Sequence, residues 1–140
     1  MTYGRDGIYI PAEVFKEYIV RGNLLPKYMV FTALDALLGK EKTIDVDMPS
    51  QGKVTLTEQR NEGRYICHLL YASPILRGNI EVIEDIVPIY NIPLELKLPK
   101  KVTNVYTAPN NEKIEFVQDE ESVRIVVPKV ECHAMIVFEY

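Results

Sequence analysis

No tryptophan occurs in this sequence of 140 residues, and there are only two cysteines and two histidines. A site that holds its ligand by aromatic stacking would therefore have to use tyrosine, of which there are nine. Cys67 and Cys132 both lie in apolar segments, and nothing signals secretion. Buried free thiols are thus favoured over a disulfide.

The two histidines each follow a cysteine directly, in the pairs Cys67-His68 and Cys132-His133. Neighbouring residues of a strand point to opposite faces, so neither pair can supply two ligands to one metal ion. A zinc site would need the two histidines, or the two cysteines, to meet across strands with two further ligands. We expect instead a partly buried histidine hydrogen-bonded to a neighbouring strand, with no metal site.

Other signatures of catalysis or cofactor binding are missing from the sequence. There is no Gly-x-Ser-x-Gly elbow for a nucleophilic serine, and a Cys67–His68 pair would diverge. No glycine-rich phosphate loop occurs, so we expect no nucleotide and no other cofactor. We assign no catalytic residue.

Charge and hydropathy exclude two classes of partner. The net charge is −4 and no basic stripe is present, which argues against nucleic acid. The first residues are polar, and no apolar run is long enough to cross a membrane. We therefore expect no membrane contact and a cytoplasmic location.

The first forty residues have helical spacing, after a short strand at residues 7–10. Pro11 suits the start of one helix and Gly22 its left-handed end, while Pro26 and Gly39 bound a second. The apolar stripes of the two helices are Val14, Phe15, Tyr18 and Ile19, and Val30, Phe31, Leu34, Leu37 and Leu38. Two helices and one strand cannot bury both stripes alone. The candidate interface residues are therefore Phe15, Tyr18, Ile19, Phe31 and Leu34.

After Lys42 the apolar period changes from 3.6 to 2. Turn signals every 8–12 residues separate eight or nine short segments of strand chemistry, at 44–48, 54–57, 64–71, 80–86, 89–98, 102–107, 113–117, 123–127 and 134–138. The pattern predicts a mainly β chain: a helical segment at 1–41, then an antiparallel β-sandwich, immunoglobulin-like or Greek-key, at 42–140.

The segment 64–71 has apolar groups on both faces and should be a central, covered strand. Alternation places Ile66, His68 and Leu70 on one face of it. We expect one core cluster between the two sheets, formed by Ile66, Leu70, Leu96, Ile125 and Ile136.

Acidic residues gather at Glu81, Glu84 and Asp85. Glycoside hydrolysis needs two carboxylates about 5–10 Å apart across a cleft. Charges that face solvent and protect a strand edge are the favoured interpretation. If the sandwich binds sugar, the candidate residues are Tyr71, Tyr90, Glu81 and Glu84, although tyrosines of a central strand usually belong to the core.

Two runs carry a resemblance to a known family: His68-Leu69-Leu70-Tyr71-Ala72-Ser73-Pro74 and Glu81-Val82-Ile83-Glu84-Asp85. They resemble the C-terminal region of large bacterial glycoside hydrolases of the β-galactosidase-like type. Such chains carry a catalytic (β/α) barrel, a flavodoxin-like trimerisation domain and a terminal β-sandwich. Residues 7–39 are similar to the last strand and helices of the middle domain, and residues 126–139 resemble the last strands of the sandwich.

The resemblance implies a terminal fragment without catalytic residues, because the family's catalytic carboxylates lie in the barrel. It implies an accessory C-terminal module that serves assembly and packs against the catalytic domain. The expected partner is that domain or a second copy of this chain. The alternative is a carbohydrate-binding module, and an independent enzyme has no support beyond scattered carboxylates.

Overall fold

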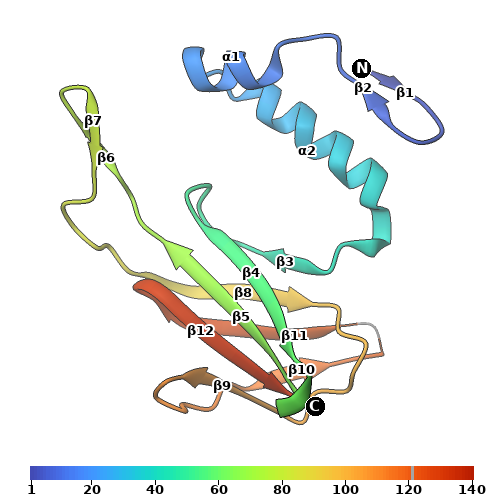
Figure 1. The fold of residues 1–140 in the computed structure, drawn as a ribbon, viewed down its shortest axis with the longest axis vertical. Coiled ribbons are helices and arrows are strands. Elements are labelled where there is room, and N and C mark those ends of the chain that lie inside the picture. Colours follow the sequence, from blue (N-terminus) through green and yellow to red (C-terminus); the bar gives the residue numbers. More distant parts are fainter. Residues whose placement is uncertain (121) are drawn as a thin grey trace. The chain divides into compact units, whose positions relative to one another are not determined.

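The computed structural model describes residues 1–120 and 122–140, which form two compact units, Met1–Lys42 and Thr43–Tyr140 (Figure 1). The predicted fold class is confirmed: the chain is mainly β, with an N-terminal helical segment and antiparallel sheets arranged as a sandwich. Within the described residues, neither helix is both long and apolar enough to cross a membrane.

The first unit contains a short hairpin and two helices. Strand β1 (Thr2–Tyr3) pairs with β2 (Ile8–Tyr9), and α1 (Val14–Arg21), α2 (Leu25–Leu38) and a 3₁₀ turn η1 (Gly39–Glu41) follow. Gly22 ends α1 in the left-handed conformation, where its N–H donates to the Tyr18 carbonyl and the Asn23 N–H donates to the Glu17 carbonyl. Pro26 lies in the first turn of α2, where a missing N–H costs nothing.

The second unit is built from two four-stranded antiparallel sheets. Sheet I has the order β10-β11-β8-β3, and sheet II has the order β4-β5-β12-β9. The bounds are β3 (Ile44–Val46), β4 (Lys53–Gln59), β5 (Arg64–Tyr71), β8 (Ile89–Leu96), β9 (Asn104–Ala108), β10 (Phe116–Gln118), β11 (Val123–Val130) and β12 (Cys132–Glu139), with a 3₁₀ turn η2 (Arg60–Glu62) between β4 and β5.

A separate hairpin of β6 (Ile75–Arg77) and β7 (Ile80–Val82) leaves the sandwich after β5 (Figure 1). The strand expected at 80–86 is therefore shorter than predicted and belongs to neither sheet. Gly78 makes the tight turn possible because it adopts a positive φ of 61°.

The core lies between the facing sides of sheets I and II. Leu96, Ile125 and Ile136 are buried in it, as predicted. The other side chains of the buried cluster come from all four central strands and from the segments around β9 and β10: Tyr65, Cys67, Leu69, Ile92, Leu94, Val102, Val105, Ile114, Val123, Val127, Val130 and Phe138.

The predicted orientation of β5 is wrong. Leu70 is 43% exposed, and Ile66 is buried outside the core cluster. The reason is the register with β12, in which Cys67 pairs with Ile136 and residue 65 with residue 138. Cross-strand partners share a face, so the inward-facing side chains of β12 place the odd-numbered residues of β5 in the core.

The two cysteines are free, but only one is buried. Burial raises the pKa of the Cys67 thiol to about 12. Cys132 is exposed at the β11–β12 turn with a positive φ of 63°, so its predicted burial is wrong. The chain reverses direction immediately before Cys132, which brings this end of β12 out of the core.

Replacing Leu96 with alanine should cost about 2–5 kcal/mol of unfolding free energy, because the removed methyl groups leave a cavity between the sheets. Denaturant unfolding of the full chain measures this loss. As the matched control, Leu76→Ala on β6 removes the same atoms from a 67% exposed side chain. The control should change stability by less than about 0.5 kcal/mol. A loss below about 1 kcal/mol for Leu96→Ala would show that β8 is peripheral to the core.

Candidate functional site

The candidate interface residues all lie on the helices of the first unit and are largely uncovered. The side chains of Phe15 and Ile19 are 69% and 76% exposed, and Phe31 is 51% exposed. Tyr18 and Leu34 are also exposed. The buried residues of the two helices are small in number and size: Val14, Pro26 and Ala33.

These helices form an apolar groove inside the first unit. It has a volume of about 540 Å³, with one wall from β2 and the residues that follow it and the others from α1 and α2. Most of the lining side chains are aliphatic or aromatic: Ile8, Ile10, Val14, Phe15, Val30, Ala33, Leu34 and Leu37. An exposed groove with apolar walls is suited to packing against another apolar element.

The candidate sugar-binding residues are divided between several elements. Tyr71 belongs to sheet II and packs against the core cluster, whereas Tyr90 belongs to sheet I and is 58% exposed. Glu81 is exposed on β7, and Glu84 follows that strand. Arg77 donates hydrogen bonds of 2.8 and 2.7 Å to the two carboxylate oxygens of Glu84, which lowers the pKa of that carboxyl. Sugar binding by this set stays a prediction.

His68 on β5 and His133 on β12 lie within hydrogen-bond distance of each other. The prediction was a histidine hydrogen-bonded to a neighbouring strand, and His68 has this arrangement. Nδ1 of His68 lies 3.0 Å from Nε2 of His133. The ring planes differ by only 8° and the centroids are 5.2 Å apart, which is close to the nitrogen–nitrogen distance plus the two ring radii. The rings are therefore nearly coplanar and end to end, and one nitrogen donates while the other accepts. Among residues 1–120 and 122–140, no three metal-ligating side chains lie together.

A hydrogen-bond network lies at one end of the sandwich, around Glu58. Its carboxylate accepts hydrogen bonds from Arg60 Nε at 2.8 Å and from the Tyr140 hydroxyl at 3.1 Å. The pKa of the Glu58 carboxyl is lowered, chiefly by the hydrogen bond from Arg60; desolvation opposes this shift, and hydrogen bonds from Tyr140 and Tyr65 add to it. Lys100 Nζ lies 4.6 Å from the centroid of the Tyr140 ring, so the last residue of the chain is held from two sides.

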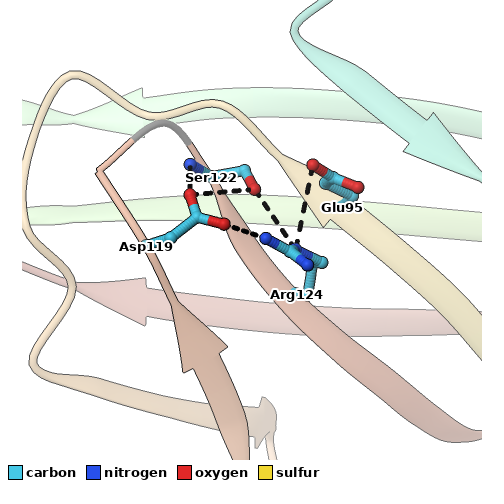
Figure 2. Close-up of polar contacts among 4 residues, drawn as sticks. All are labelled: Glu95, Asp119, Ser122 and Arg124. Atoms are coloured by element: carbon cyan, nitrogen blue, oxygen red, sulfur yellow. Dashed lines mark hydrogen bonds and ion pairs between the residues drawn. The ribbon is translucent and has the colours of Figure 1, made fainter.

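A second network holds Arg124 on β11 (Figure 2). Its guanidinium forms an ion pair with Asp119, lies 3.9 Å from the Glu95 carboxylate, and lies 3.4 Å from Ser122 Oγ. Asp119 also accepts a hydrogen bond of 2.8 Å from the Ser122 backbone N–H. Because Arg124 and Glu95 are cross-strand partners, the network ties the end of the β10–β11 hairpin to β8.

Beside this network, the outer face of sheet I forms an open groove of about 810 Å³. We call it the sheet I groove. Its lining combines apolar and charged side chains from all four strands and the segments beside them: Asp45, Val46, Asp47, Pro93, Leu94, Glu95, Lys113, Ile114, Glu115, Phe116, Val117, Arg124, Ile125, Val126 and Pro128. The pattern of the sequence did not predict this groove. Apolar residues at solvent-facing positions of strands with alternating polarity, such as Val117 and Val126, could have indicated it.

Comparison with solved structures finds α-L-fucosidase isoenzyme 2 from Paenibacillus thiaminolyticus, with a TM-score of 0.90 and 46% sequence identity. The match covers 96% of this chain and 21% of the fucosidase, so the chain spans about a fifth of the length of that glycoside hydrolase. The expected similarity to a small part of a glycoside hydrolase is thus confirmed. The relative found is a fucosidase, so the comparison does not single out the β-galactosidase-like type.

A cycloisomaltooligosaccharide glucanotransferase from Paenibacillus sp., complexed with cycloisomaltoheptaose, matches with a TM-score of 0.50 and 15% identity. This match covers 68% of the chain and 16% of the glucanotransferase, and it shows a shared fold only. No protein-family model and no curated protein matches the chain.

Glu58→Gln should destabilise the chain at neutral pH and have progressively less effect in acid. Because Arg60 holds the pKa of the Glu58 carboxyl below its ordinary value, the carboxylate stabilises the fold above the unfolded pKa, and this contribution is lost as the pH falls through the folded pKa. Urea unfolding at a series of pH values measures the difference. Arg60→Gln keeps the carboxylate but removes the main cause of the shift, so it should reduce the stability in the same pH window. A pH-independent effect of Glu58→Gln would contradict this assignment.

Proposed function

We propose that this chain is a non-catalytic accessory module at the C-terminal end of a glycoside hydrolase, where it serves assembly and packs against the catalytic domain. The observation that carries the proposal is the similarity to a fucosidase at 46% identity, extending over nearly the whole chain but only 21% of the enzyme. The two motif runs add the finer proposal that the parent enzyme is of the β-galactosidase-like type.

The exposed apolar surface of the first unit supports the assembly role. Monomeric proteins rarely leave large contiguous apolar patches in water, because their burial is favourable by roughly 25 cal/mol per Å². Both helices of this unit present such side chains, and the groove between them is lined by aliphatic residues from three elements. The helices are therefore the surface that we assign to assembly.

The lowered pKa values of two carboxyl groups support a non-catalytic role. Glycoside hydrolysis uses two carboxylates on opposite sides of the scissile bond, one of them with a raised pKa as the general acid. The pKa of Glu84 is instead lowered by its two hydrogen bonds from Arg77. Glu58 is likewise held in the ionised form by Arg60.

Carbohydrate binding is the second candidate function, and the exposure of Tyr90 and Glu81 favours it. A tyrosine ring on a sheet surface can stack on a sugar, and a carboxylate can accept hydrogen bonds from hydroxyl groups. Retention of the chain on immobilised oligosaccharide, lost in Tyr90→Ala, would favour this function over assembly.

The isolated chain should not hydrolyse aryl-glycosides such as 4-nitrophenyl α-L-fucoside or 4-nitrophenyl β-galactoside. The family's catalytic carboxylates belong to a barrel, and hydrogen bonds from Arg77 lower the pKa of the Glu84 carboxyl, which disfavours its use as a general acid. Release of 4-nitrophenol, followed by absorbance, measures turnover. Turnover that disappears in Glu81→Gln or Glu84→Gln, with the fold intact by circular dichroism, would reject the accessory-module proposal.

The isolated chain should self-associate through its helices, most simply as a two-fold dimer. Light-scattering mass measured over a range of concentrations should show the association. It should be lost in a Phe15→Glu, Leu34→Glu double variant that keeps its β-rich circular dichroism. The matched control is Leu76→Glu, Ile80→Glu, which adds the same charges at exposed apolar positions of the β6–β7 hairpin. A wild-type chain that stays monomeric at high concentration would show that the helices do not mediate self-association.

A further inference from the structure

We propose that the sheet I groove is a docking site for a protein segment that carries an apolar ridge bordered by lysine or arginine side chains. The proposal builds on the accessory-module function and adds the chemistry of the surface that the sandwich would contact. It uses the outer face of sheet I, whereas the assembly surface proposed above lies on the helices.

The floor of the groove is apolar where the pattern of the sheet calls for polar residues. An antiparallel sheet with one face in the core normally presents polar side chains on its other face. In sheet I, Val126 and Pro93 are direct cross-strand partners, and both belong to the groove lining. Val126 is 53% exposed and Val117 on the neighbouring β10 is 67% exposed. With Pro128 on β11, these side chains make a patch that crosses three strands.

The rim of the groove is predominantly acidic. The lining includes four carboxylates, from Asp45, Asp47, Glu95 and Glu115, and two cations, from Lys113 and Arg124. The guanidinium of Arg124 is already engaged by Asp119, outside the lining, and by Glu95 (Figure 2). Since carboxylates outnumber cations in the lining by four to two, the net charge of the groove is negative, and complementarity favours a basic partner.

The residue types that line the groove are more typical of a protein–protein contact than of a sugar-binding site. Sugar sites rely on exposed aromatic rings, but Phe116 is the sole aromatic among the described lining residues, and it packs against the core. An apolar centre with a charged rim is the usual arrangement of a protein–protein contact. A partner with alternating apolar and basic residues would place its apolar side chains on the valine and proline floor and its cations at the rim.

The groove is also held in a defined shape before any partner binds. The Arg124 network fastens the β10–β11 hairpin to β8, and the backbone N–H of Asp47 donates a hydrogen bond of 3.1 Å to the Pro93 carbonyl. The second contact fixes the acidic end of β3 beside the apolar floor. Binding therefore costs little ordering of the backbone on this side.

Two synthetic peptides test the proposal on the full chain. In one, valine alternates with lysine, and in the other, glutamate replaces each lysine. Amide chemical shifts of the ¹⁵N-labelled chain locate the binding surface, and fluorescence anisotropy of labelled peptide gives the Kd. We expect the valine–lysine peptide to shift amides of β3, β8, β10 and β11, and the valine–glutamate peptide to leave them unchanged.

Two pairs of variants separate the groove from nonspecific attraction. Val117→Ser with Val126→Ser should raise the Kd about tenfold or more, because both apolar contacts are lost. The control Leu76→Ser with Ile80→Ser removes equally exposed apolar groups from the β6–β7 hairpin and should leave the Kd unchanged. Asp47→Asn with Glu115→Gln should raise the Kd about threefold. Glu81→Gln with Asp85→Asn changes the net charge equally and should have no such effect.

Several outcomes would overturn the proposal. These are equal binding of the two peptides, absence of shifts with the valine–lysine peptide, and controls that weaken binding as much as the groove variants. If L-fucose or cycloisomaltoheptaose shifts the groove amides and the peptide does not, the groove is a carbohydrate site. None of these variants alters the helices, so light scattering and the turnover assay still test the proposed function separately.

Discussion

The pairing of β5 with β12 is the constraint on which the sandwich depends. Eight consecutive residues of β5 lie opposite eight residues of β12, and this register decides the face of every side chain on both strands. With residue 67 opposite residue 136, the core receives Cys67 and Leu69 from β5, and His68 is placed on the outer face beside His133. A slip of one residue would expose the core side chains and separate the imidazoles.

The second unit buries its large apolar side chains, whereas the first unit leaves many of them exposed. The second unit closes a core between two sheets, so that Leu96, Ile136 and Phe138 are fully buried. The first unit has one two-stranded sheet and two helices, and it provides no layer that could cover both helical stripes. The first unit therefore leaves apolar side chains of both helices exposed, whereas the sandwich has its own core. This difference is the physical basis for assigning assembly to the helices.

Much of the fold could be predicted because periodicity and turn residues report local structure. Pro26, Gly22 and the change of period after Lys42 identified the helices and the start of the strands. The face of β5 could not be predicted, since Ile66 and Leu70 are as apolar as Cys67 and Leu69, and the choice is made by β12, more than sixty residues away. The meeting of His68 with His133 depends on the same long-range register. Arg124 was missed for a similar reason, because its partners come from β8 and from the turn before β11.

The proline and valine residues on the outside of sheet I are difficult to explain by the needs of the fold alone. The core would form equally well with polar residues at these positions, because positions 93, 117 and 126 point away from it. Polar side chains there would also lower the risk of unwanted association. A surface that exposes apolar groups inside a charged rim, with Arg124 already neutralised by two carboxylates, is instead suited to a contact that excludes water. The sandwich would then act through its outer face, and the core would serve to hold that face in shape.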